Sequence, residues 1–133
     1  MIELKNITFS YEGREQGGLR NINLTVKNGE CILLCGRSGC GKTTLTRVLN
    51  GLCPQFYPGD LTGSYLLDGQ AALNMTIHQL GTTLGSVFQD PRSRFFATNT
   101  TDALARGLNN IPLARPVIRK RYEPFCHQIQ LVQ

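Results

Sequence analysis

Apolar and polar residues alternate along the first part of the chain, which is the pattern of a strand with one buried face. Ile2 and Leu4 fall on one face, and Ile7, Phe9 and Tyr11 share a face after a shift in register. The pattern therefore predicts a strand whose register changes partway along its length.

A second strand is expected beyond the polar, glycine-rich turn at residues 12–18. Residues 22–26 alternate again and end before the pair Asn28-Gly29, which is typical of a hairpin turn. We expect these two strands to be antiparallel. The apolar run at residues 31–35 shows no alternation, which is typical of a strand buried on both faces in a parallel sheet.

A helix is predicted from Lys42, because the apolar residues that follow recur at i, i+3, i+4 and i+7. These residues are Leu45, Val48, Leu49 and Leu52. Gly51 and Pro54 mark the end of this helix. Further elements are expected as a strand at 64–67, a helix of one or two turns from Thr76 through Leu80, a strand at 83–88 and two helical pieces within 101–132.

The segment between the apolar run and this helix contains Gly, four residues and then Gly-Lys-Thr, a pattern that binds the phosphates of a nucleoside triphosphate. Its glycines let the backbone N–H groups point inward, and the helix presents the positive end of its dipole. We expect Lys42 to reach the β- and γ-phosphates, Thr43 to supply an oxygen for Mg²⁺ and Thr44 to add a phosphate contact. The predicted binding residues of this loop are Gly36, Arg37, Ser38, Gly39, Cys40, Gly41, Lys42, Thr43 and Thr44. MgATP is the expected ligand.

Two segments before this loop and one after it follow the order of a known family. They are Ile7-Thr8-Phe9-Ser10-Tyr11, the stretch 21–30, and Val87-Phe88-Gln89-Asp90-Pro91. Together they resemble the N-terminal half of an ABC transporter ATPase. The resemblance implies that Tyr11 stacks on the adenine ring, although a tyrosine at a strand end more commonly only packs. It also implies that Gln89 binds Mg²⁺ and the attacking water, which makes Lys42 and Gln89 the catalytic candidates.

Residues 89–102 are similar to the ATPases of energy-coupling-factor (ECF) importers, which serve the uptake of vitamins and metals. The usual form has glutamine where this chain has Arg94. Phe95 and Phe96 are expected either to pack inside the domain or to form part of the dock for a membrane-subunit helix.

The resemblance implies an α/β fold, a P-loop NTPase core of ABC type with an N-terminal antiparallel β-subdomain, incomplete on its C-terminal side. Residues 1–133 are then one partial nucleotide-binding domain. Residues 1–90 form the β-subdomain and the core through the glutamine loop, and residues 91–133 begin the helical subdomain.

Half of the family's hydrolytic residues are not in this sequence, which contains no Leu-Ser-Gly-Gly-Gln and no apolar strand followed by Asp-Glu and a later histidine. Residues 64–69 superficially resemble that strand, but they precede the glutamine loop and end in a turn glycine. We therefore expect the 133-residue chain to bind MgATP without hydrolysing it. The alternatives are a non-hydrolysing nucleotide-binding or interaction module and a gene fragment without a function of its own.

Composition narrows the setting further. The net charge is +5, but no nucleic-acid motif accompanies it, so no nucleic-acid partner is expected. The longest apolar run has five residues, far short of a membrane span, and the five cysteines include no CxxC pair and are expected to be reduced. The resemblance implies a cytoplasmic protein at the inner face of the membrane, with a transmembrane importer subunit and a second ATP-binding domain as partners.

Overall fold

The computed structural model describes residues 1–13, 17–87, 116–117, 120 and 124. The chain divides into two compact units, Met1–Ser86 and Val87–Gln133, and the first unit contains nearly all of the described residues. Most of the two helical pieces expected in 101–132 lies outside the described residues.

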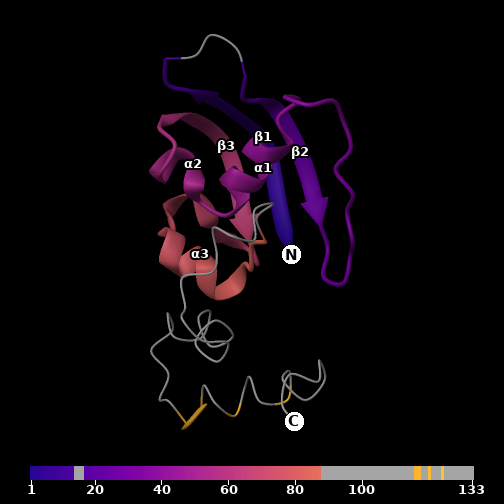
Figure 1. Cartoon of the computed structure of the whole chain (residues 1–133), viewed down its shortest axis with the longest axis vertical. Coiled ribbons are helices and arrows are strands. Elements are labelled where there is room, and N and C mark those ends of the chain that lie inside the picture. Colours follow the sequence, from indigo (N-terminus) through magenta and orange to yellow (C-terminus); the bar gives the residue numbers. More distant parts are fainter. Residues whose placement is uncertain (14–16, 88–115, 118–119, 121–123, 125–133) are drawn as a thin grey trace, which may run out of the picture. The chain divides into compact units, whose positions relative to one another are not determined.

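The first unit is built on a four-stranded antiparallel sheet with the strand order β2-β1-β3-β4 (Figure 1). Its strands are β1 (Ile2–Tyr11), β2 (Leu19–Val26), β3 (Gly59–Leu67) and β4 (Gln70–Ala71). The antiparallel pairing of the first two strands confirms the prediction. The third strand begins earlier than the alternation alone indicated.

A bulge in β1 explains the change of register in the sequence pattern. Asn6 has a φ of 53°, and the pairing of β1 with β2 shifts between Leu4 and Ile7. An extra residue at this point returns the next apolar side chains to the buried face. As a result Leu4, Ile7 and Phe9 are all buried, as the pattern predicted.

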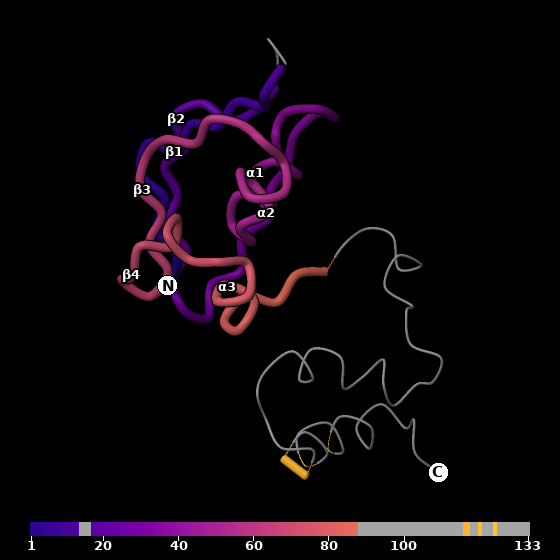
Figure 2. The backbone as a smooth tube through the Cα atoms, turned by 90° about the vertical axis from the view of Figure 1, so that its left-hand side faces the viewer, coloured from indigo at the N-terminus to yellow at the C-terminus, as the bar shows by residue number. Residues whose placement is uncertain are grey.

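The helices of this unit lie on one face of the sheet (Figures 1 and 2). They are α1 (Lys42–Leu49), α2 (Leu52–Gln55), the 3-10 turn η1 (Ala72–Asn74) and α3 (Ile77–Thr83). The helix from Lys42 is confirmed. The helix from Thr76 is confirmed as well, because Thr76 accepts from the Gln79 N–H and the Gln79 side chain accepts from the Thr76 N–H, which is a capping box.

The core lies between the sheet and these helices. Its buried apolar side chains are Leu4, Ile7, Phe9, Leu19, Leu45, Val48, Cys53, Tyr65, Leu67, Ala72 and Leu80. Tyr65 is the largest of them, and its hydroxyl donates to the Leu49 carbonyl at 2.9 Å, so strand β3 is hydrogen-bonded to the end of α1. Desolvation raises the pKa of Tyr65 to about 12.

The strand predicted over 31–35 is wrong. These residues have no strand conformation and are exposed, and Figure 1 shows the connection from β2 to α1 as a long loop. The pair Asn28-Gly29 does form a turn, closed by the Glu30 N–H and the Lys27 carbonyl at 3.2 Å, but no strand follows it. A strand requires a neighbour for its backbone and cover for its faces, and none of the described strands pairs with this run.

The strand predicted over 83–88 is also wrong as far as the structure describes it. Thr83 is the last residue of α3, and residues 84–87 are not in a strand. Leu84 packs partly against the core, but Val87 is 92% exposed. Phe88 lies outside the described residues. The capped helix extends over the start of the apolar segment, and no described strand pairs with the rest.

Candidate nucleotide-binding site

The glycine-containing loop occupies the connection into α1, where the sequence predicted it. Gly39 and Gly41 have φ values of 81° and 98°, in the left-handed region that favours glycine. A Cβ atom at Gly41 would also lie only 3.0 Å from the Gly18 carbonyl oxygen. Gly41 caps α1 without a side-chain hydrogen bond, and no acidic residue lies in the first turn of the helix. The helix N-terminus is therefore available to an anion.

Lys42 closes the loop on itself. Its ammonium donates to the carbonyl oxygens of Gly36 and Arg37, at 2.8 Å each, and lies 3.5 Å from the Cys40 sulfur. The positive charge is thus held inside the curve of the loop. Thr43, the next residue, is exposed at the start of α1.

Tyr11 at the end of β1 is connected to α1 through its hydroxyl. The Tyr11 hydroxyl oxygen lies 3.1 Å from the Thr44 hydroxyl oxygen, and it accepts a hydrogen bond from the Arg47 guanidinium at 3.2 Å. Thr44 is 8% exposed, the only polar residue among the buried ones that the structure describes. The ring of Tyr11 meets that of Phe9 edge to face, with 4.8 Å between the centroids.

Arg47 is held from a second side by Tyr57. Its guanidinium carbon lies 4.1 Å from the centroid of the Tyr57 ring, a cation–π arrangement. The hydrogen bond to Tyr11 raises the pKa of Arg47, so the charge is permanent. Burial raises the pKa of the neighbouring Cys53 thiol, which favours its neutral form.

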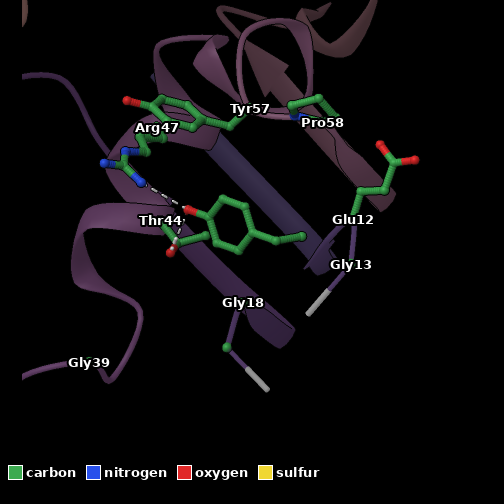
Figure 3. Close-up of a pocket in the computed structure, with 10 residues that line it drawn as sticks. Glu12, Gly13, Gly18, Gly39, Thr44, Arg47, Tyr57 and Pro58 are labelled. Atoms are coloured by element: carbon green, nitrogen blue, oxygen red, sulfur yellow. Dashed lines mark hydrogen bonds between the residues drawn. The ribbon is translucent and has the colours of Figure 1, made fainter. Parts of the chain in front are cut away.

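These side chains border a cavity of about 740 Å³, within the range of small-molecule sites (Figure 3). It is lined by Tyr11, Glu12, Gly13, Gly17, Gly18, Gly39, Thr44, Arg47, Tyr57 and Pro58. In Figure 3, Thr44 and Arg47 border one side of the cavity and Glu12 and Gly13 the other. Gly39 in the same view belongs to the glycine-containing loop. The cavity therefore extends from that loop to the end of β1.

The structure brings part of the predicted site together. Tyr11, Gly39 and Thr44 line one cavity, and Lys42 lies on the loop that leads to it. Gln89 lies outside the described residues. The cavity has the volume of a small-molecule site, and the N-terminus of α1 beside it is open to an anion.

Sequence reasoning missed Arg47 and Tyr57. A signal for Arg47 was present, because residues at i and i+3 lie on the same helix face and Arg47 follows Thr44 at that spacing. Tyr57 follows α2 in a connection whose path the sequence pattern does not determine.

Among the residues that the structure describes, no group of three or more His, Cys, Asp or Glu side chains is placed to hold a metal ion. Within the same part of the chain, no helix has the length and apolar character needed to cross a bilayer.

Comparison with known proteins identifies the family of the chain. Residues 19–130 match the model of a family described as ABC transporter. Proteins described as ABC transporter ATP-binding proteins are 43% identical in Treponema denticola over 98% of this chain, 38% in Lactiplantibacillus plantarum over 98%, and 35% in Methanosarcina acetivorans over 100%. The matches cover 27%, 23% and 21% of those proteins, so the chain spans about a quarter of their length. The chain belongs to the ABC transporter family, in the ATP-binding domain that carries the family's P-loop NTPase fold.

Proposed function

We propose that this chain binds MgATP as part of the ATP-binding, energy-coupling component of an ECF-type membrane importer. The observation that carries the proposal is one cavity lined by Gly39 of the loop, Thr44 of α1 and Tyr11 of β1. A loop for phosphates and an aromatic ring for the base then contact the two ends of one ligand.

Each residue has a role in this proposal. The backbone N–H groups of residues 36–41 and the N-terminus of α1 bind phosphate oxygens, and the Lys42 ammonium exchanges its two loop carbonyls for the β- and γ-phosphates. Thr43 and Gln89 are the proposed Mg²⁺ ligands. The ring of Tyr11 stacks on adenine.

The importer assignment rests on the resemblance of residues 89–102 to ECF-type ATPases. Its solute is a vitamin, a metal ion or another small molecule, which the membrane proteins select. The proposed partners are a transmembrane subunit and a second ATP-binding domain, and the proposed location is the cytoplasmic face of the membrane.

Titration calorimetry of the whole 133-residue chain with MgATP tests the binding. We expect saturable binding, and Lys42→Ala should weaken it at least about tenfold because charge-assisted hydrogen bonds to phosphate are lost. Lys27→Ala, which removes the same charge from an exposed position outside the motif at residues 36–43, is the matched control and should leave affinity unchanged. Absence of binding, or equal losses in both variants, would contradict the proposal.

ATPases of this family hydrolyse ATP, whereas we propose that these 133 residues bind it without turnover. A steady-state phosphate-release assay on the pure chain should stay at background. Release that Lys42→Ala abolishes would overturn this part of the proposal and leave the binding claim intact.

A further inference from the structure

We infer that Arg47 is a positioning residue for nucleotide binding, which holds the ring of Tyr11 in the orientation that receives the base. The inference rests on the proposed function and assigns a role to a side chain outside the loop motif. Arg47 donates to the Tyr11 hydroxyl at 3.2 Å, and both residues line the cavity beside Gly39.

The position of Arg47 is itself fixed from two directions. Its backbone belongs to α1, one turn beyond Thr44, and its guanidinium lies 4.1 Å from the Tyr57 ring centroid. The contact with an aromatic face already restricts the guanidinium. Donating a hydrogen bond from this position therefore costs little additional rotamer freedom. Arg47 is therefore a pre-organised donor rather than a mobile surface cation.

The hydroxyl of Tyr11 is the point through which this order passes to the base site. Arg47 and Thr44 fix the hydroxyl end of the ring, and the edge contact with Phe9 fixes its side. Stacking needs the ring in one orientation, and a ring that is free to turn loses part of its stacking free energy to ordering. The orientation of the Tyr11 ring is thus fixed relative to α1, the helix that begins at the phosphate-binding motif.

This arrangement predicts a selective effect on the base. Arg47→Met keeps the length of the side chain and removes its donors, so it should weaken MgATP binding about three- to tenfold, the range expected for one hydrogen bond. Binding of magnesium tripolyphosphate, which has phosphates and no base, should be unchanged. Arg20→Met is the matched control, since Arg20 is exposed on β2 and is not among the cavity residues, and it should change neither affinity.

A double-mutant cycle identifies the route of the effect. Tyr11→Phe keeps the ring and removes the hydroxyl, so it should lower the ratio of MgATP to tripolyphosphate affinity as much as Arg47→Met does. The double variant should lose no more than either single variant. Arg47→Lys, which can still donate, should recover part of the ratio.

The results distinguish a positioning role of Arg47 from a direct contact with phosphate. An equal loss for both ligands in a folded Arg47→Met variant, as judged by circular dichroism, means a direct phosphate contact and overturns the inference. Additive losses in the cycle, or an unchanged ratio, overturn it as well. If Arg47→Met does not fold, Tyr11→Phe and Arg47→Lys carry the same comparison. Should the unchanged chain bind neither ligand, the proposed function fails and this inference fails with it.

Discussion

The sheet-and-helix core and the loop of residues 27–41 contain side chains of similar hydrophobicity in opposite surroundings. Phe9 is 1% exposed in the core, whereas Leu33 is 84% exposed in the loop. The strands of the core have hydrogen-bonded neighbours and helices over one face, while no described strand pairs with the loop. An apolar segment gains free energy from burial, but it becomes buried only where a neighbouring strand pairs with its backbone and other elements cover its side chains.

The same loop contains most of the phosphate-binding motif, Gly36 to Gly41, and leads directly into Lys42 of α1. Its order comes from internal bonds, with Lys42 donating to Gly36 and Arg37, and from attachment to α1. A binding loop is built from backbone groups that remain available to a ligand, so extensive burial would work against it. Stability therefore resides in the core, and the candidate binding groups lie in the exposed loop.

The largest expected effect is on the core side of this comparison. Phe9→Ala should lower the free energy of unfolding by about 3 to 5 kcal/mol, because it opens a cavity under the sheet. Leu33→Ala, also an apolar truncation, should change it by less than about 0.5 kcal/mol because the side chain is already in water. Urea denaturation followed by circular dichroism measures both, and similar losses would show that the contrast is mistaken.

Alkaline pH should destabilise the core through Tyr65. Desolvation raises its pKa to about 12 in the folded chain, against 10.0 for the free side chain. The unfolded chain therefore loses this proton first, and stability that is complete below pH 10 falls as the pH rises towards 12. The difference of roughly two pKa units corresponds to at most about 2 to 3 kcal/mol.

Substitution isolates this contribution from the other groups that titrate. Tyr65→Phe should cost about 1 kcal/mol at pH 8, since the Leu49 carbonyl loses its donor, and should reduce the fall between pH 10 and 12. Tyr57→Phe is the control and should keep the fall of the parent chain. Urea unfolding at pH 8 and pH 11.5 gives the comparison, and an identical fall in all three chains would contradict it.

The sequence predicted those parts of the fold that local chemistry determines. The register change in β1 was visible because apolar residues skip one position around Asn6, and the start of α3 was visible in Thr76. The strands at 31–35 and 83–88 were predicted wrongly because a continuous apolar run indicates burial only when another segment supplies a partner. No short window of sequence contains that information.

The candidate site likewise has a part that a short stretch of sequence predicts and a part that depends on the folded chain. The loop is a contiguous motif, and its glycines and Lys42 could be assigned from spacing alone. Tyr11 was assigned from family resemblance, and its stacking on adenine stays a prediction; the structure places its hydroxyl beside that of Thr44. Arg47 was missed because its partners Tyr11 and Tyr57 come from other elements, which only the folded chain brings together.

A smaller effect is expected from the cap that fixes the beginning of α3. Thr76→Ala removes the acceptor for the Gln79 N–H and should lower the free energy of unfolding by about 1 kcal/mol. Thr83→Ala, at the exposed end of the same helix, is the matched control and should be neutral or slightly stabilising. Urea denaturation at neutral pH is sufficient. Equal effects would mean that the helix depends on packing alone, like the sheet.

The smallest effect on stability should come from Leu33→Ser, which makes the exposed loop more polar. The free energy of unfolding should change by less than about 0.5 kcal/mol, because no buried contact is lost. Self-association should decrease, because Leu33 lies between two further exposed apolar residues, Ile32 and Leu34, and adjacent apolar side chains on a surface favour contact between molecules. Light scattering during concentration measures association, and Lys27→Ser, a change on the same loop that removes no apolar surface, is the control. A clear loss of stability in Leu33→Ser would mean that the loop is packed in solution, and the contrast between the two regions would then have to be abandoned.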